Sequence, residues 1–132
     1  MNSAEAVKWY RKAAEQGFAA AQYDLGRMYF KGEVVPRDYT EAAKWYRKLA
    51  EQDAAAAQYD TAAQYELGGM YFRGQGVPRD YVIAYMWFSL AAAKGDKDAR
   101  KMLDDLERKL TPEQIAEAQK LAREWKSTSP KP

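Results

Sequence analysis

The chain contains no cysteine and no histidine among its 132 residues. Without cysteine it has no disulfide framework, no thiol nucleophile and no thiolate metal site. Without histidine it lacks the commonest general base and the commonest metal ligand of proteins. These absences predict a protein that is not an enzyme and that has no metal site.

A strong charge excess and a long apolar run are also missing. The net charge is +2 with 30% charged residues, which indicates a mixed solvated surface and not the basic stripe of a nucleic-acid-binding protein. No run of about 18 apolar residues occurs, so we expect no membrane span. The N-terminus lacks the layout of a signal peptide. As given, the chain is predicted to be cytoplasmic, with a secreted or periplasmic parent left open.

Two segments of the chain are nearly identical. Residues 20–45 read AAQYDLGRMYFKGEVVPRDYTEAAKW, and residues 62–87 read AAQYELGGMYFRGQGVPRDYVIAYMW, at an offset of 42. A third, partial copy lies upstream and pairs Trp9 with Trp45 at an offset of 36. Self-similarity at this period is typical of helical repeat arrays.

Each repeat predicts two helices joined by a short loop. The first helix spans about residues 18–31, where apolar residues recur at spacings of three and four. Gly32 is expected to end it in a left-handed conformation, and Pro36 prevents its continuation. Asp38 is placed to cap the second helix. Residues 111–114, Thr-Pro-Glu-Gln, predict the start of a closing helix, so the chain has about seven helices.

Three positions within the repeats depart from local preference. Gly26 and Gly68 lie inside the first helix of their repeats, where glycine costs about 1 kcal/mol relative to alanine. A close approach to large aromatic residues of the second helix explains this repeated cost better than a helix kink. Val34 stands where the next repeat has Gly76. If that position requires positive φ, Val34 is strained, or the first loop takes another path.

The repeated motif is A-x-x-x-L-G-x-x-Y-x-x-G-x-G-V-P-x-D-Y, followed by A-x-x-W and then A-A-E-Q-G. It resembles the Sel-one-like repeat, a relative of the tetratricopeptide repeat, over roughly residues 2–95. The ending TPEQIAEAQKLAREW also looks like the closing helix of bacterial members. The resemblance implies an all-α fold, a right-handed α/α superhelix of helix pairs that serves as a scaffold or adaptor for protein partners without a cofactor.

The repeat pattern divides the chain into parts of one repeat domain, residues 1–126. We expect a partial repeat at 2–17, a first repeat at 18–53, a second repeat at 54–95, capping helices at 96–126 and a disordered tail at 127–132.

The second repeat carries a six-residue insertion. AAQYDT at 56–61 is followed by AAQYEL at 62–67, as in a tandem duplication. In one interpretation the duplication bulges as an extra turn or loop, and the helix restarts at Thr61 with Gln64 completing a capping box. In the other, residues 38–72 form one fused helix that cannot fold back and produces a swapped dimer.

The resemblance also implies a binding surface, because the first helices of tetratricopeptide-like stacks line the concave side. The candidate residues on these helices are Tyr23, Arg27, Phe30, Lys31, Tyr65, Phe72 and Arg73. They would suit a peptide with acidic and apolar groups, since tyrosine and arginine are common at binding hot spots. The competing interpretation is that the phenylalanines pack between repeats and that the tyrosines are partly core.

Self-association is the alternative function. The first helix of the chain, with Val7, Trp9 and Tyr10, has no partner helix before it, so its apolar face is open to a second copy. With the insertion at 56–61, this face would form a homodimer. A protein or peptide partner on the concave side remains the favoured prediction.

Overall fold

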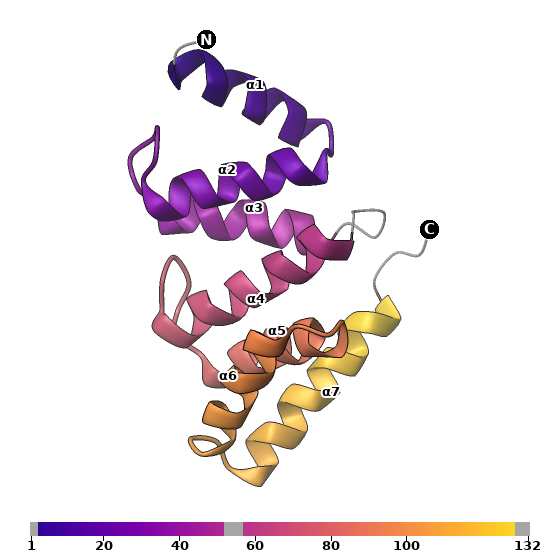
Figure 1. Ribbon diagram of the computed structural model, residues 1–132. Coiled ribbons are helices and arrows are strands. Elements are labelled where there is room, and N and C mark those ends of the chain that lie inside the picture. The colour runs from indigo at the N-terminus through magenta and orange to yellow at the C-terminus, as the bar shows by residue number, and fades with distance from the viewer. Residues whose placement is uncertain (1–2, 52–56, 129–132) are drawn as a thin grey trace.

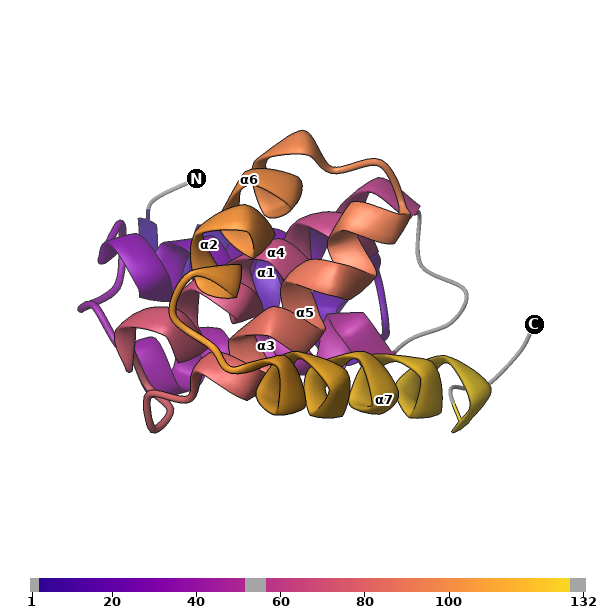
Figure 2. The ribbon, with the colours of Figure 1, turned by 90° about the horizontal axis from the view of Figure 1, so that it is seen from below.

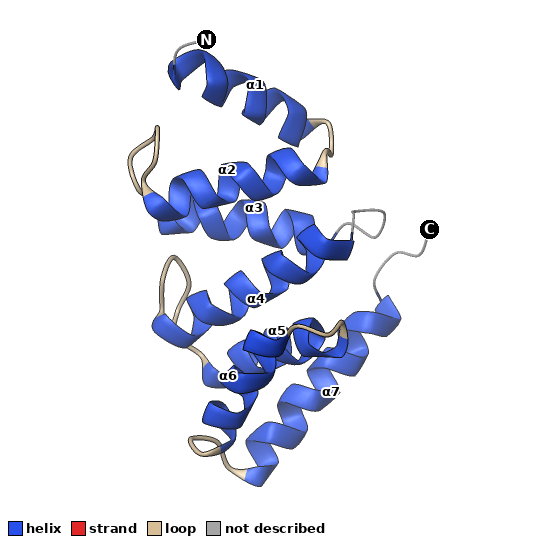
Figure 3. Cartoon of the chain, viewed as in Figure 1, coloured by secondary structure: helices blue, strands red, loops and turns tan. Residues whose placement is uncertain are grey.

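The computed structural model describes residues 3–51 and 57–128, and within these ranges every regular element is a helix (Figure 3). The seven helices are α1 (Ser3–Glu15), α2 (Ala19–Lys31), α3 (Tyr39–Glu51), α4 (Ala57–Arg73), α5 (Tyr81–Ala93), α6 (Lys97–Glu107) and α7 (Pro112–Thr128). The all-α repeat fold is therefore confirmed. None of the helices in the described ranges is long and apolar enough to cross a membrane.

The helices stack in chain order from α1 to α6 (Figure 1). Successive helices pack against each other, and the pairs α2–α3 and α4–α5 correspond to the two full repeats. Because each helix contacts mainly its neighbours in the chain, the core runs the length of the stack, as expected of a repeat array.

The loop inside each repeat has the same geometry in both copies. Gly32 ends α2 in the left-handed region at φ 73°, and its N–H donates to the carbonyl oxygen of Met28 at 2.8 Å. Asp38 accepts a hydrogen bond from the N–H of Glu41 at 3.0 Å through its side chain. Asp80 caps α5 in the same way. The predicted ends of both helices are thus confirmed.

Gly26 and Gly68 are required by close helix packing. A Cβ atom on Gly26 would lie 2.7 Å from Cε1 of Tyr46, and one on Gly68 would lie 2.7 Å from Cδ1 of Phe88. Tyr46 and Phe88 occupy equivalent positions of the second helices, α3 and α5. The prediction of a close approach is confirmed, and the cost of glycine in these helices is offset by the packing of a fully buried ring.

Val34 adopts the conformation of the glycine it replaces. Its φ is 71°, against 75° for Gly76, so both loops follow the same path and the valine is strained. A Cβ on Gly76 would lie 2.4 Å from the carbonyl carbon of Tyr39 in the preceding repeat. Val34 is tolerated because the residue is 52% exposed, so its side chain is not confined by the core.

The insertion lengthens α4 by one turn. The helix α2, shifted by 42, corresponds to residues 61–73, but α4 begins at Ala57. The prediction that the helix restarts at Thr61 is therefore wrong, because Thr61 lies inside α4 and Gln64 is buried. The prediction of one fused helix is also wrong, since α3 ends at Glu51 and α4 packs back against it. Residues 52–56 lie outside the described residues.

The extra turn is integrated into the core. The Tyr59 ring lies 5.9 Å from that of Tyr23 in the preceding repeat, and Asp60 forms an ion pair with Lys94 after α5. The inserted residues therefore connect three helices, which explains why they continue the helix instead of forming a loop.

The helix α7 closes the stack by lying along α5. Its start is capped as predicted: Gln114 N–H donates to Thr111 Oγ1 at 3.1 Å, and Thr111 N–H donates to Gln114 Oε1 at 2.9 Å. Figure 2 shows α6 and α7 on opposite sides of α5, which contacts both. The helix α7 runs to Thr128, and the part of the predicted tail at 129–132 lies outside the described residues.

The sequence of α5 is apolar on the side that α7 covers as well as on the side that faces the rest of the stack. The exposed side of α3 carries Lys44 and Lys48, whereas the equivalent positions of α5 are Met86 and Leu90, both buried. A helix that is apolar all round is one that is buried on every side. Leu121 and Trp125 of α7 pack against the cluster that contains Met86 and Leu90.

Candidate protein-binding surface

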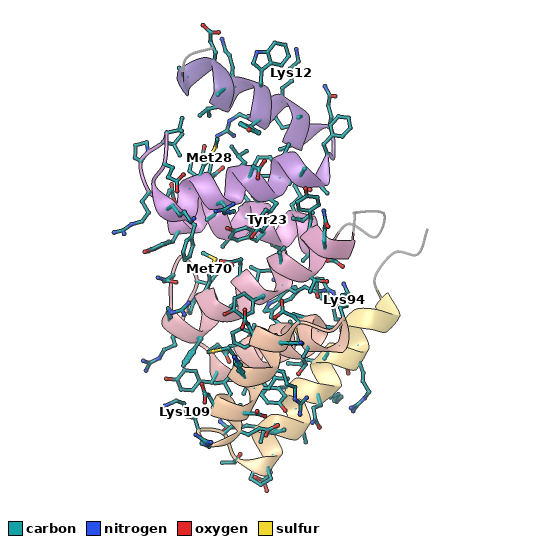
Figure 4. All side chains as sticks on the ribbon, in the orientation of Figure 1. Lys12, Tyr23, Met28, Met70, Lys94 and Lys109 are labelled. Carbon is teal, nitrogen blue, oxygen red and sulfur yellow. The ribbon has the colours of Figure 1, made fainter. Side chains whose placement is uncertain are left out.

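Most of the predicted binding residues lie on the side of the stack formed by α2 and α4. We call this surface the A face. Its polar residues are Tyr23, Arg27, Lys31, Tyr65, Glu66 and Arg73. Figure 4 labels Tyr23, which lies near the middle of the stack where α2, α3 and α4 meet.

Tyr23 is held in place by two neighbouring rings. Its ring centroid lies 5.9 Å from that of Tyr46 and 5.9 Å from that of Tyr59, and the side chain is half-buried. The exposed guanidinium of Arg27, one helical turn later, lies over the Tyr23 ring at 5.9 Å. Burial raises the pKa of the Tyr23 hydroxyl, so it remains a neutral hydrogen-bonding group.

The second repeat has a similar arrangement, but its arginine comes from a different position of the helix. Tyr65 is equivalent to Tyr23, and its ring packs 5.6 Å from that of Phe88. Gly69 stands at the position equivalent to Arg27, and the guanidinium of Arg73 folds over it: Nη1 lies 2.9 Å from where a Cβ would be. Each repeat therefore presents one tyrosine with one nearby arginine.

Glu66 lies among these groups and was not among the predicted site residues. Its carboxyl is half-buried, and burial raises its pKa, while the charges of Arg73, Arg27 and Lys31 act in the opposite direction. The same carboxylate raises the pKa of Tyr23 and Tyr65 in addition to their burial. The signal for it was available in the sequence, because Asp24 and Glu66 occupy equivalent positions after the repeated Ala-Gln-Tyr.

Phe30 and Phe72 are engaged within the protein. The Phe30 ring lies 5.2 Å from that of Tyr39, and Phe72 lies 5.4 Å from Tyr81. Both phenylalanines are half-buried near the end of the first helix of their repeat, where they pack against the first residue of the second helix. Lys31 is exposed and pairs with Glu33 at 3.9 Å. The structure therefore brings the tyrosines and arginines together around Glu66 and places the phenylalanines at the loops.

The residues predicted for self-association lie on α1. Trp9 is 60% exposed and Tyr10 is 36% exposed, while Val7 is half-buried. The equivalent Trp45 of α3 is buried in a cluster with Leu25 of α2. The described part of the chain offers no helix that covers the outer side of α1.

The A face offers hydrogen-bonding and charged groups. In the described residues no three acidic side chains gather to hold a metal ion. Guanidinium groups beside tyrosine rings can recognise a carboxylate and an apolar neighbour together. Such an arrangement suits recognition of a polypeptide.

Comparison with known proteins identifies the repeat. The pattern of the Sel1 repeat matches residues 2–18, 19–53 and 61–96, more than half of the chain. The unmatched residues 54–60 overlap the insertion. The comparison with curated proteins finds no match.

Solved bacterial structures share the fold. A protective antigen of uropathogenic Escherichia coli with an SLR fold is 38% identical, with a TM-score of 0.83 over 94% of this chain, and the chain spans only 26% of that protein. A Sel1 repeat protein from Oxalobacter formigenes is 41% identical, with a TM-score of 0.68, covering 79% of this chain and 74% of its own. Cysteine-rich protein B of Helicobacter pylori is 26% identical, with a TM-score of 0.65, covering 78% and 73%.

Proposed function

Because the chain belongs to the Sel1 repeat family, whose repeats are commonly protein-interaction modules, we propose that it is a non-catalytic scaffold that binds a peptide or protein partner on the A face. The observation that carries this proposal is the repeated pair of tyrosine and arginine, Tyr23 with Arg27 and Tyr65 with Arg73, around Glu66.

The chemistry of these groups defines the partner. A guanidinium binds a carboxylate through two parallel hydrogen bonds, and a tyrosine ring offers a rigid apolar surface with a polar tip. The partner is therefore a polypeptide that presents acidic side chains to Arg27 and Arg73, with apolar side chains between them. Lys31 adds positive charge at the edge of the same surface.

The test is a comparison of captured proteins. The immobilised chain and its Arg27→Ala/Arg73→Ala variant are exposed to an extract of the source organism, and bound proteins are quantified by mass spectrometry. We expect the variant to capture at least tenfold less of the partner while it remains folded, as judged by far-ultraviolet circular dichroism. The control, Lys97→Ala/Lys101→Ala, removes two exposed charges of α6 and should capture the partner normally. Equal capture by both variants would contradict the A-face assignment.

Tyr23 requires a conservative substitution in this test. Its ring contacts Tyr46 and Tyr59, so alanine would remove core packing as well as a binding group. Tyr23→Phe keeps the ring and removes only the hydroxyl. A weaker capture by Tyr23→Phe, with unchanged stability, would assign the hydroxyl to the partner contact.

A second candidate function is self-association through α1. It is favoured by the exposure of Trp9, an aromatic residue whose counterpart Trp45 is only 4% exposed. Light scattering behind a sizing column, across a concentration series, tests it. A dimer that Trp9→Glu converts to a monomer would support this function, and a monomer at every concentration would contradict it.

A further inference from the structure

A groove of about 460 Å³ runs along the outer side of α3, separate from the A face. The residues that line it include Thr40, Ala43, Arg47, Lys48, Leu67 and Val77. Ala43 and Leu67, at 6% and 1% exposed, belong to the buried core, and Val77 packs against that core. The α3 residues recur at spacings of three and four, so they form one stripe along about three turns.

The equivalent stripe of α5 is occupied by a helix of this same chain. Tyr85, Met86 and Leu90 stand 42 residues after Ala43, Lys44 and Lys48 and are 3%, 7% and 2% exposed. Residues of α7 cover this stripe. Ala118 belongs to the same core cluster as Tyr85, and Ile115 packs against that cluster, while Leu121, Ala122 and Trp125 pack against the cluster that contains Met86 and Leu90. The outer side of α5, the second helix of its repeat, therefore accepts an amphipathic helix, and α3 is the equivalent helix of the preceding repeat.

The charges of α3 distinguish its groove from the surface beneath α7. Lys44, Arg47 and Lys48 are exposed along it. Lys44 and Arg47 reach Glu41 and Glu51 only at 3.9 and 3.8 Å, and exposed pairs of this kind contribute little to stability. Lys48 lies over the Trp45 ring at 5.3 Å. The carboxylates of a partner can therefore engage these cations at small cost.

Arg47 links this groove to the end of α7. Its guanidinium lies 5.8 Å from the centroid of the Trp87 ring and 5.5 Å from that of Trp125. A helix placed in the groove would thus lie beside α7.

From these observations we propose that the groove of α3 is a second docking site, which receives an amphipathic helix of a partner protein with acidic residues along its polar flank. Its apolar side packs on the partly exposed Tyr71 and Val77, over the buried Ala43 and Leu67 at the floor of the groove. Its carboxylates face Lys44, Arg47 and Lys48. This site is independent of the proposed A-face function, because none of its residues belongs to the A face.

The probe for this site is a peptide derived from α7, because that helix already packs on the equivalent side of α5. A fluorescent peptide of residues 111–128 carries Lys120→Glu, Arg123→Glu and Lys126→Glu, and its binding to the full chain is followed by anisotropy. The unaltered peptide is the control for charge. We expect saturable binding of the acidic peptide, at least tenfold tighter than that of the unaltered peptide, and weakening with added salt.

Protein variants locate the site. Lys44→Glu/Lys48→Glu should weaken binding of the acidic peptide at least tenfold, whereas Lys97→Glu/Lys101→Glu on α6 and Arg27→Ala/Arg73→Ala on the A face should leave it unchanged. Amide chemical-shift changes should concentrate at Ala43, Leu67 and Val77. Equal binding by the α3 and α6 variants, or shift changes on the A face, would overturn the proposal. It would also be overturned by a dimer of the chain alone that Lys44→Glu/Lys48→Glu dissociates, since the groove would then belong to a second copy.

Discussion

At the scale of single residues, the conformation and packing of a few positions decide whether a repeat is formed correctly. Gly68 admits the Phe88 ring against the backbone of α4, whereas its neighbour Gly69 faces only the movable guanidinium of Arg73. Two adjacent glycines of one helix therefore have opposite consequences when a methyl group is added. Sequence reasoning identified the first from its recurrence at Gly26, and nothing in the sequence indicated the second.

We expect Gly68→Ala to lower the free energy of unfolding by about 1–3 kcal/mol, because the new Cβ would lie 2.7 Å from the Phe88 ring. The matched control, Gly69→Ala, should raise it by about 0.5–1 kcal/mol through the better helix propensity of alanine. Urea unfolding, monitored by circular dichroism, measures the free energy of unfolding of the two variants. Equal effects of the same sign at the two positions would contradict the packing argument.

Val34→Gly should raise the free energy of unfolding by about 1 kcal/mol, because it relieves a β-branched residue at φ 71°. The adjacent Val35→Gly is the control and should lower the free energy of unfolding, since residue 35 has no positive φ and is half-buried, so glycine there adds freedom to the unfolded chain and removes apolar burial. Thermal unfolding of both variants provides the measurement. A loss of stability in Val34→Gly would show that the strain is negligible.

At the scale of elements, the duplicated segment shows how tertiary contacts decide the fate of an insertion. Three of the six residues, two alanines and a glutamine, are good helix formers, and this local preference is compatible with a bulge, a turn or a fused helix. The contact of Tyr59 with Tyr23 and the ion pair of Asp60 with Lys94 hold one added turn against neighbouring helices. The start of α4 was therefore mispredicted because its stabilising partners lie far away in the sequence.

Tyr59→Ala should lower the free energy of unfolding by about 1–2 kcal/mol, because it removes an aromatic pair and leaves the Tyr23 ring partly uncovered. Gln58→Ala, at the exposed neighbouring position of the same turn, should change it by less than about 0.5 kcal/mol. Chemical denaturation of the two variants checks this. Similar small effects at both positions would mean that the added turn contributes nothing to the fold.

At the scale of the whole molecule, the A face couples two repeats through charge. Glu66 of α4 interacts with Arg27 and Lys31 of α2 as well as with Arg73 of its own helix. Burial nevertheless dominates and raises its pKa, so ionised Glu66 is a cost to the folded state. The pH dependence of global stability therefore reports on this surface.

Because the pKa of Glu66 is raised on folding, the folded protein binds its proton more strongly than the unfolded chain does. Its contribution to stability is full below the unfolded pKa of about 4.5 and is lost as pH rises through the folded value. Glu66→Gln should therefore be more stable than the parent protein at pH 7, and this gain should vanish below about pH 4.

Urea unfolding at several pH values measures this difference. Glu117→Gln, at an exposed position of α7, controls for the loss of one negative charge. A Glu66→Gln variant less stable than the parent at pH 7 would contradict the direction, and would mean that attraction to the three cations outweighs burial.

The sequence by itself determined the helical repeat, its seven helices, the helix ends at Gly32 and Asp38, and the family, but it left open whether the loop at Val34 follows the path of the loop at Gly76. These features follow from local chemistry, since caps, glycines and apolar spacing act within a few residues and recur with the repeat. Only the tertiary structure decided that the insertion extends α4, that α7 covers α5, and that Glu66 lies among the cations of two repeats. Each of these depends on contacts between residues distant in the chain, whose geometry local preference does not encode.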